Sequence, residues 1–427
     1  MIKANEILGM NARNQLYTSF NSNTAKAICS SKYATKILLG NNNIPTAKLY
    51  GILGTIEDIN DYDWKKLEKD FVIKPTNGNA GKGVVAFSTK HKNKLEWKDR
   101  LGEIWDLEDI KLHCFDILEG QYSTYGDKNH IIIEERVPIH PKLLRYTYKG
   151  TPDIRVIVFN SVPIMALLRL PTEESEGRAN QSQGAIGVGI DMATGITTYA
   201  AAHKNQLIKY LPGTKKKLNG IIIPFWTKVL KTAIEASNAA KLMFSGVDIF
   251  LHKEQGPMVV ELNANPGLSI QVANKAGLRR RLERVEDLNV LNPDHGVRIS
   301  QALFAESFAD KIKAKEGLTI VQPREEVIVQ GENKVKQTVT ALINTGRYRS
   351  AISGQLSSQL GLIDVDDLLW FQQEAGEGKV PVVEIKVKLK EKRLKTAMIV
   401  SKKLNKGKHR IEIGRKDLAG FLVGVGE

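Results

Sequence analysis

Three side chains with oxygen donors lie in a stretch whose apolar pattern predicts a hairpin. The runs Val247–Leu251 and Met258–Leu262 flank a polar turn, which predicts two antiparallel strands. Asp248 lies near the start of the first strand, and Glu261 and Asn263 end the second, two residues apart and therefore on one face. Two carboxylates and an amide oxygen suit Mg²⁺, which completes its shell with water and phosphate oxygens, so the set indicates a nucleoside triphosphate site. An ordinary hairpin with polar residues at its end is the alternative interpretation.

A glycine-rich stretch, TNGNAGKGVVAFS, follows the short apolar run Phe71–Pro75. Because it joins two expected strands, it is not the phosphate loop that precedes a helix. Glycines allow backbone N–H groups to approach a phosphate closely. Lys74 ends the first strand and Lys82 lies in the loop itself, so both could contact phosphate oxygens. A purely structural hairpin loop is the alternative.

The remaining pattern alternates helices and strands and then changes character. We expect a strand at Ile131–Val137, then a hairpin carrying Asp153, Arg155 and Arg169, and a mobile loop at 171–184. Apolar spacing and end signals predict helices over Asn21–Gly40, Leu107–Gly120, Pro224–Leu242, Ser269–Glu286 and Val297–Lys315. Beyond a linker at 317–324 the pattern is mostly short strands. The predicted domains are therefore 1–316 and 325–427.

Composition places the chain among ordinary globular proteins. Of its 427 residues, 42% are hydrophobic and 26% are charged, and no apolar run reaches membrane-spanning length. Cys29 and Cys114 give neither a disulfide framework nor a zinc spacing, and the first residues are too polar for a secretory signal. We therefore expect a cytoplasmic protein with no membrane partner. The net charge of +15 favours polyanionic partners such as ATP, acidic peptides or nucleic acid.

Part of the positive charge is concentrated near the C-terminus. Between Lys386 and Arg410 lie eleven basic residues against one acid, Glu391. Two interpretations stay open. The run could be the solvated face of an edge strand, where lysines discourage aggregation, or it could be a binding patch.

Together these features resemble the ATP-grasp superfamily, and specifically its alpha-L-glutamate ligase-related branch, from about Ile7 to about Ala309. The matching stretches include GMNARNQLY, LHCFDILEGQYS before the IIIEERV strand, and NPGLSIQVANKAGLRRRLERVE after the hairpin. The resemblance implies an α+β fold in which ATP lies between two subdomains. Only about thirty residues precede Lys32, fewer than in most relatives, so the acceptor site would be open to a large substrate or completed by another chain.

The resemblance also implies a role for each matching residue. Phosphate contacts would come from Lys32, or from its competitor Lys36, and from Lys74, under a flexible loop that includes Asn77, Gly78, Gly81, Lys82 and Gly83. Glu134 would receive the adenine amino group, with the backbone of Arg136 and Val137 at the ring edge and Asp153 at the ribose hydroxyls. Asp248, Glu261 and Asn263 would hold Mg²⁺, with Mn²⁺ as a second candidate.

The implied reaction is an ATP-dependent ligation of a carboxylate to an amine. A carboxylate attacks the γ-phosphate to form an acyl phosphate, and an amine then displaces phosphate to give an amide. Arg169 would contact the reacting phosphate and Arg155 a substrate carboxylate, although each could be a surface ion pair instead. The expected partners are an amino acid such as glutamate and a peptide or small-molecule acceptor. The rival hypothesis is a nucleic-acid or acidic-protein binding factor with ATP as a structural ligand.

The last hundred residues resemble a retropepsin-like domain of the ATP-dependent zinc protease-like kind. The matching stretches are TALINTGRYRSAIS and HRIEIGRKDLAGFLV, and the fold expected there is small and mostly β. Asn344 stands where that family has the catalytic aspartate, and it cannot ionise, so aspartic proteolysis is not expected. The domain would be a peptide-binding module or would form a homodimer, or Asn344 is an engineered substitution. No cluster of Cys and His supports zinc.

Overall fold

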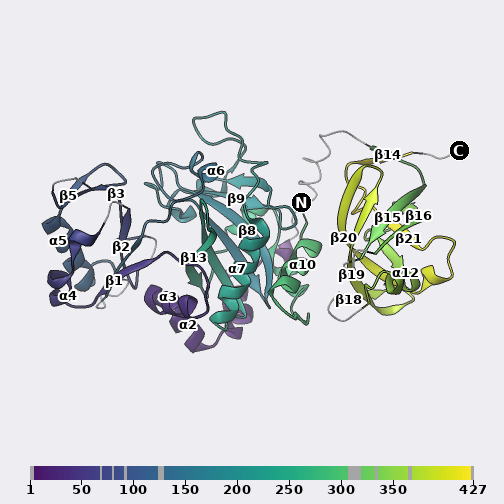
Figure 1. The fold of residues 1–427 in the computed structure, drawn as a ribbon, viewed down its shortest axis with the longest axis horizontal. Coiled ribbons are helices and arrows are strands. Elements are labelled where there is room, and N and C mark those ends of the chain that lie inside the picture. Colours follow the sequence, from purple (N-terminus) through teal and green to yellow (C-terminus); the bar gives the residue numbers. More distant parts are fainter. Residues whose placement is uncertain are drawn as a thin grey trace. The chain divides into compact units, whose positions relative to one another are not determined.

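The chain forms two compact units in a computed structural model (Figure 1). The structure describes residues 4–67, 70–78, 81–90, 94–123, 129–305, 319–331, 335–363 and 368–424. The first unit contains residues 1–190 and 195–286, and the second contains 191–194 and 287–427. The predicted boundary at residue 316 and the start of the predicted linker lie outside the described residues. The bounds predicted for the helix Val297–Lys315 are wrong, because the helix begins at Pro293 and ends at Leu303; residues 306–315 lie outside the described residues.

The first unit begins with short helical segments. These are η1 (Ala4–Glu6), α1 (Met10–Ala12), η2 (Arg13–Tyr17), η3 (Thr18–Phe20), α2 (Asn23–Ser30) and α3 (Lys32–Asn41). The prediction of one helix over Asn21–Gly40 is therefore wrong. Ser31 adopts an extended backbone, and its hydroxyl accepts a hydrogen bond from the Ala34 N–H at 3.2 Å. Serine at this position caps a new helix and so interrupts the old one.

A small six-stranded sheet follows, in the order β1-β6-β2-β3-β4-β5. Its strands are β1 (Leu49–Leu53), β2 (Phe71–Pro75), β3 (Val85–Lys90), β4 (Glu96–Asp99), β5 (Ile104–Asp106) and β6 (Ile131–Glu135). The helices that accompany it are α4 (Ile56–Asp61), η4 (Trp64–Lys66) and α5 (Leu107–Leu118). The predicted strand–glycine loop–strand unit is confirmed, because β2 pairs antiparallel with β3. The helix predicted over Leu107–Gly120 is also confirmed.

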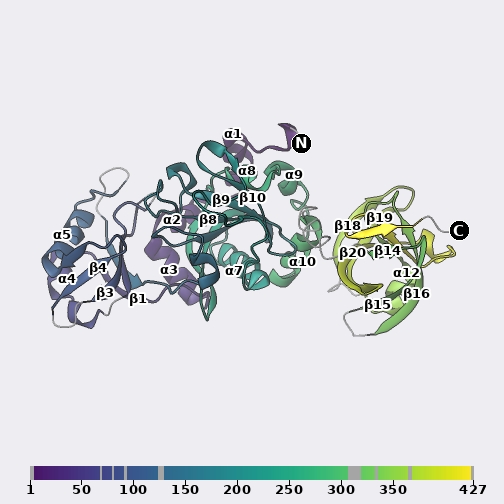
Figure 2. The same ribbon diagram turned by 90° about the horizontal axis from the view of Figure 1, so that it is seen from above.

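A larger seven-stranded sheet has the order β11-β10-β9-β8-β7-β12-β13. Its strands are β7 (Asp153–Phe159), β8 (Val162–Leu170), β9 (Ile186–Ile190), β10 (Thr197–Ala201), β11 (Leu207–Ile208), β12 (Phe244–His252) and β13 (Gly256–Asn263). The helices of this part are α6 (Pro141–Leu144), η5 (Gln181–Gln183), η6 (His203–Asn205), α7 (Trp226–Ala239), α8 (Ile270–Asn274) and α9 (Leu278–Glu283). In Figure 2, α7 covers one face of the sheet, and α8 and α9 cover the other.

The predicted hairpin around Asp248 is confirmed as β12 and β13, but the helix predicted to follow it is not continuous. Two short helices, α8 and α9, replace the single helix expected over Ser269–Glu286. Lys275 ends the first helix in a left-handed conformation with φ of 47°, which stops helical hydrogen bonding.

The second unit contains helix α10 (Pro293–Leu303) and a β-barrel that closes where β15 pairs with β19. Its strands are β14 (Thr319–Val321), β15 (Arg324–Gln330), β16 (Lys336–Asn344), β17 (Ala351–Ser353), β18 (Leu368–Glu374), β19 (Gly378–Leu389), β20 (Lys392–Ser401), β21 (Ile411–Gly414) and β22 (Phe421–Val423). Two further helices are α12 (Gly354–Gln359) and η8 (Lys403–Asn405). Within the described part of the chain, no helix is both long enough and apolar enough to cross a membrane.

The edge-strand interpretation of the basic run is wrong for β19, which contains its first residues. β19 pairs with β15, β18 and β20, and β20 pairs with β19 and β17. At Lys386 and Lys388, β19 therefore has a neighbour on each side, and these lysines do not protect an open edge. β17 pairs with β20 only at Ile399–Ser401, beyond the basic residues of that strand.

Candidate functional site

One face of the large sheet collects the predicted catalytic and metal-binding residues. Asp248 lies directly opposite Glu261 on β13 and opposite Arg155 on β7, and Asp153 lies opposite Arg169 on β8. Residues directly opposite one another in a sheet share a face, as do residues two apart along a strand. The strand registers therefore bring all of these side chains to one face, and Asn263 joins Glu261 there.

Two arginines and two aspartates of this face form one buried ion network. Arg155 donates to both carboxylate oxygens of Asp248 at 2.6 Å, from Nε and Nη2. Arg169 donates to both oxygens of Asp153 at 2.5 Å, and its Nη2 also donates to Asp248 at 2.6 Å. The side chains are at most 16% exposed. Two positive and two negative charges leave the network neutral, which is the condition for keeping charges out of water.

The two aspartates of the network differ in their ease of protonation. Burial raises the pKa of Asp153 to about 6. The attraction of Arg169 opposes this increase, but burial and the repulsion from Asp248 together outweigh it. Burial also opposes the ionisation of Asp248, but the charges of Arg155 and Arg169 outweigh it and hold the pKa of Asp248 below its usual value. Asp248 is therefore the more firmly ionised of the two carboxylates.

The donor set at the end of the hairpin fits a hard divalent cation. Asp248 and Glu261 are cross-strand neighbours, and both supply hard oxygen donors. Arg155 and Arg169 already hold the Asp248 oxygens, so a metal ion would share this carboxylate with them. The Asn263 side chain adds an amide oxygen on the same face. Over the described ranges, no cluster of three His, Cys, Asp or Glu residues forms a candidate metal site. The set of two carboxylates and one amide fits Mg²⁺ bound together with a triphosphate.

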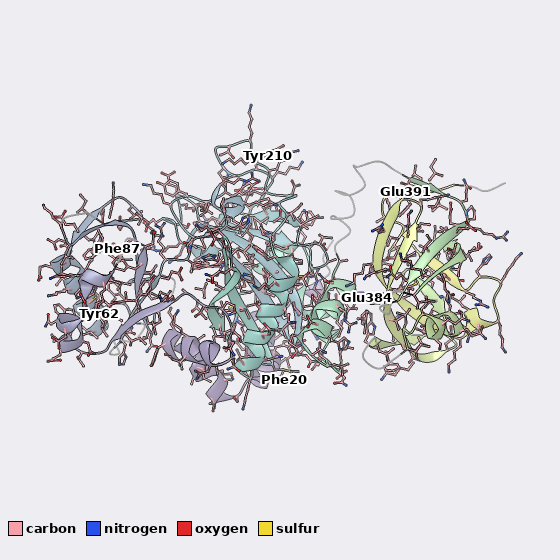
Figure 3. The ribbon with its side chains drawn as sticks, in the orientation of Figure 1. Phe20, Tyr62, Phe87, Tyr210, Glu384 and Glu391 are labelled. Atoms are coloured by element: carbon pink, nitrogen blue, oxygen red, sulfur yellow. The ribbon has the colours of Figure 1, made fainter. Side chains whose placement is uncertain are left out.

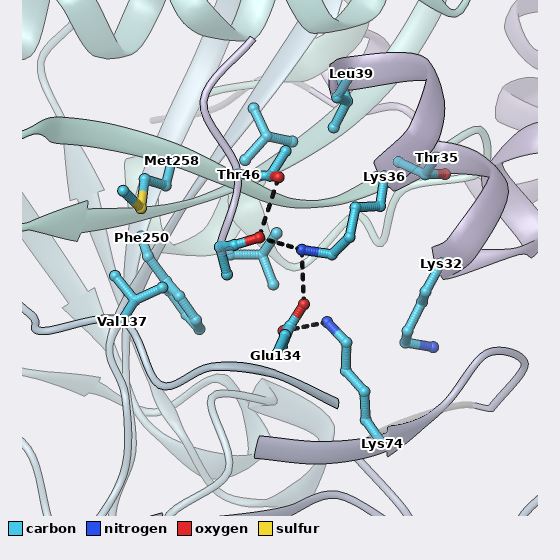
Figure 4. A pocket seen from close by; sticks show the side chains of 13 residues that line it. Lys32, Thr35, Lys36, Leu39, Thr46, Lys74, Glu134, Val137, Phe250 and Met258 are labelled. Atoms are coloured by element: carbon cyan, nitrogen blue, oxygen red, sulfur yellow. Dashed lines mark hydrogen bonds and ion pairs between the residues drawn. The ribbon is translucent and has the colours of Figure 1, made fainter. Parts of the chain in front are cut away.

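A pocket lies between α3, the small sheet and the β12–β13 hairpin (Figure 4). Helix α3 contributes four side chains at positions i, i+3, i+4 and i+7, namely Lys32, Thr35, Lys36 and Leu39. The wall formed by the segments after β6 and in the hairpin is apolar: Val137, Phe250, Met258, Val259 and Val260. The pocket holds about 370 Å³ of empty space, part of it open to solvent. One side therefore suits a flat apolar group and the other suits anions.

Three lysines and one glutamate give the pocket its charge. Glu134 accepts from Lys74 at 2.5 Å and forms an ion pair with Lys36 at 2.8 Å (Figure 4). Burial alone would raise the pKa of Glu134, but the two lysines outweigh it and hold that pKa below its usual value. Burial lowers the pKa of Lys36, and it also lowers the pKa of Lys32. The pocket carries more positive than negative charge, as a polyphosphate site requires.

Lys32 connects this pocket to the glycine-rich loop and to Glu261 of the hairpin. Its ammonium group donates to the Gly78 carbonyl oxygen at 3.0 Å, and it interacts electrostatically with Glu261 and Glu134. Gly81 and Gly83 have φ of 75° and 71°, values that favour glycine, so this turn depends on them. A phosphate chain entering between the lysines would thus run toward the carboxylates of the hairpin.

The family model for sugar-transfer associated ATP-grasp proteins matches residues 11–287, which is more than half of the chain. The chain belongs to this ATP-grasp family. No curated protein is similar enough in sequence to be matched to it.

Solved structures to which the chain is similar include several ATP-grasp ligases. The ligase PsnB, complexed with a minimal precursor, is 16% identical with a TM-score of 0.36, and the match covers 62% of this chain and 63% of PsnB. The D-alanine–D-alanine ligase from Bacillus anthracis complexed with ATP is 16% identical with a TM-score of 0.34, covering 69% and 70% of the two chains. An L-amino acid ligase from Bacillus licheniformis is 13% identical with a TM-score of 0.35, covering 62% and 49%. The ATP-grasp chain thus spans less than two thirds of the length of PsnB.

The remaining predicted residues of the ATP-grasp site lie at its edges. Asp153, expected at the ribose hydroxyls, does not line the pocket, since Arg169 holds both of its oxygens. The Arg136 N–H donates to the Asp70 carbonyl oxygen at 3.2 Å, while Val137 lines the pocket. Lys82 and Asn77 are exposed, and residues 79 and 80 of the predicted phosphate-covering loop lie outside the described residues. The roles of these residues stay predictions.

Sequence reasoning missed two groups of residues in this site. The first group is the apolar wall with Phe250 and Met258. The position of the turn predicts that these two residues lie opposite each other, but not that they line a pocket. Asn129 is buried, and its side-chain oxygen accepts from the Thr76 hydroxyl at 2.7 Å and from the Asn77 N–H at 2.8 Å. It fixes the entry to the glycine-rich loop from about fifty residues away in the sequence, and no local pattern indicates this.

The charge state of Glu134 gives a test of the lysine–glutamate arrangement by pH. Because the folded-state pKa of Glu134 is lowered, its stabilising contribution is present above about pH 4.5 and is lost as pH falls through the folded value. At pH 7 we expect the free energy of unfolding of Glu134→Gln to be about 2 kcal/mol lower than that of the wild type, since two buried lysines lose their partner. Urea unfolding followed by tryptophan fluorescence should show this gap narrowing from pH 5 to pH 3. A gap that stays constant would mean that Glu134 is not ionised in the folded state.

Proposed function

We propose that the first unit is an ATP- and Mg²⁺-dependent ligase that joins a carboxylate to an amine through an acyl phosphate. The observation that carries this proposal is the position of the ionic network and hairpin carboxylates beside a lysine-rich pocket with an apolar wall. The apolar wall suits the adenine base and Glu134 its amino group. Lys74 and Lys32 suit the phosphates.

The chemistry requires donors at the place where negative charge develops. Arg155 and Arg169 each keep their Nη1 nitrogen free of hydrogen bonds to described residues, while Nε and Nη2 are held by aspartates. Two guanidinium groups fixed in this way can bind the acid substrate and the transferring phosphoryl group without reorganising. Asp248, Glu261 and Asn263 would hold the metal ion. Bound there, it would neutralise charge on the phosphate oxygens.

The proposed reaction has two steps, a phosphoryl transfer and an acyl transfer. A carboxylate oxygen of the acid substrate attacks the γ-phosphorus, the bond to the β-phosphate oxygen breaks, and ADP leaves. The amine nitrogen attacks the acyl carbon, the bond to the phosphate oxygen breaks, and the nitrogen loses a proton to the solution. Both steps place negative charge on oxygens that face the arginines, so electrostatic stabilisation supplies the catalysis. We propose an amino acid such as glutamate as one substrate and a peptide or small molecule as the other.

The second unit has a separate proposed role as a retropepsin-like module without proteolytic activity. The Asn344 side-chain oxygen accepts from the N–H groups of Gly346 and Arg347 at 3.1 and 3.2 Å, and its amide donates to Glu412 at 3.2 Å. Asparagine thus supports this turn with its amide but cannot share a proton with a second carboxylate. We also propose a relationship to glutamate ligases and domain limits of 1–316 and 325–427. We further propose that the protein forms a homodimer through this unit and is cytoplasmic.

The ligase proposal is tested by coupling ADP release to product mass. Purified protein, ATP and Mg²⁺ are incubated with pairs of carboxylic acids and amines, including glutamate and short peptides. The expected result is ADP and phosphate release that requires both partners, with a product one water lighter than their sum. Release that needs neither partner, or no release with any pair, would overturn the ligase proposal. The rival, a binding factor with ATP as a structural ligand, predicts tight ATP binding without turnover.

A further inference from the structure

The outward face of the β19–β20 pair carries four cations in two directly opposed pairs. Lys386 lies opposite Lys395, and Lys388 lies opposite Arg393. Lys386 and Lys388 are two residues apart on one strand, so all four side chains share a face. We call these four residues the basic face.

The packing of the barrel shows that this face points to solvent. The intervening residues Ile385, Val387 and Leu389 are buried in the core of the second unit. Lys386 and Arg393 are exposed, and the side chains of Lys388 and Lys395 are 41% and 51% exposed. The four cations are therefore available to a partner from outside the unit.

Neighbouring acids balance the charge of the basic face only in part. Glu384 pairs with Lys395 at 3.0 Å, and the exposed Glu391 lies 3.7 Å from Lys388; both glutamates are marked in Figure 3. Lys386 and Arg393 form no ion pair with a described residue. Like charges directly opposite one another destabilise a sheet. Since β19 is paired on both sides at Lys386 and Lys388, protection of an edge does not account for the lysines of that strand.

The surroundings of the basic face favour a peptide over a nucleic acid. Gln330 on β15 lies beside Lys386, and Ile328 lies beside Lys388, with Thr338 of β16 next to it. Strands β15, β16, β19 and β20 contain no aromatic residue, so these four strands offer bases no ring on which to stack. In an extended peptide, alternate side chains repeat every ~6.8 Å, which matches the spacing of Lys386 and Lys388 along β19.

We propose that the basic face is a docking site for an extended acidic peptide segment of a partner protein. Carboxylates on alternate residues would pair with the two rows of cations, and the exposed Ile328, at 38% exposure, would contact an apolar side chain between them. This binding does not depend on ligase activity in the first unit. It gives the second unit a function other than proteolysis.

The test uses the full chain and a fluorescein-labelled peptide of alternating Glu and Thr, about twelve residues long to span the strand. Fluorescence anisotropy should show saturable binding that weakens as salt is raised, because exposed charges are screened. We expect Lys386→Glu to weaken binding at least about tenfold, since it removes a cation and repels the carboxylates. The same substitution places an opposite charge across from Lys395, so thermal stability should be retained or increased.

A matched control separates the basic face from net charge. Lys406→Glu changes the total charge equally at an exposed position that lies outside the basic face. It should reduce affinity by less than about twofold, as expected of a distant exposed charge. Lys388→Gln with Arg393→Gln provides a second variant of the face without added repulsion, and it should also weaken binding. Equal effects of Lys386→Glu and Lys406→Glu, no saturable peptide binding, or tighter binding of a single-stranded oligonucleotide through the same residues would each overturn the proposal.

Discussion

Asp248→Asn is expected to lower the free energy of unfolding by about 3 to 5 kcal/mol, the usual effect of removing one partner from a buried ion pair. Arg155 would lose both of its hydrogen bonds to the Asp248 carboxylate, and Arg169 would keep its hydrogen bonds to Asp153. Asparagine preserves the size of the side chain, so the loss is electrostatic rather than a packing defect. Urea unfolding at pH 7 measures it. The variant should also lose ADP release in the ligase assay.

Glu261→Gln is the control that separates the metal role from the structural role of Asp248. Glu261 lies directly opposite Asp248 on the same face but contributes no carboxylate to the arginine network. It is only half-buried, so its replacement should change the free energy of unfolding by less than about 1 kcal/mol. Its metal-dependent ADP release should nevertheless fall as strongly as that of Asp248→Asn. An unchanged unfolding curve for Asp248→Asn would contradict the structural part of this account.

Lys74→Met is expected to weaken the binding of a non-hydrolysable ATP analogue by about 100-fold, which corresponds to one or two charge-assisted hydrogen bonds. Lys74 is buried at the end of β2, and Glu134 holds its ammonium group in the pocket. Methionine keeps the length of the side chain and removes only the charge. Isothermal titration calorimetry with the analogue and Mg²⁺ provides the measurement.

The comparison for this variant is Lys66→Met, on η4, where the side chain is 83% exposed and forms an ion pair with Asp63. This substitution removes the same charge from a position nearby in the sequence, but Lys66 does not line the pocket. Its affinity for the analogue should stay within about twofold of wild type, because an exposed charge is screened. If both variants lose affinity equally, Lys74 does not contact the phosphates and the position of the nucleotide in the pocket is wrong.

Most elements of the first unit were predictable because their signals are local. The β12–β13 hairpin follows from two apolar runs and a turn, and the β2–β3 hairpin follows from its glycines. The helix predictions were wrong where a single residue interrupts a continuous apolar pattern. Ser31 and Lys275 each end hydrogen bonding within a stretch that has helical spacing on both sides, so the period alone did not reveal the break.

By itself, the sequence determined that Glu261 and Asn263 share one face, because they lie two residues apart on one strand. A register shift between Asp248 and Ile249 places Asp248 opposite Glu261, and only the folded structure decided this irregularity. Only the tertiary structure decided that Arg155 and Arg169 bind Asp248, since this depends on β7 lying between β8 and β12. Likewise, only the fold joins Lys36 to Glu134, and only barrel closure makes β19 an interior strand. The physical reason is the same in each case. Pairing between distant strands is fixed by the packing of the whole sheet, which no short stretch of sequence contains.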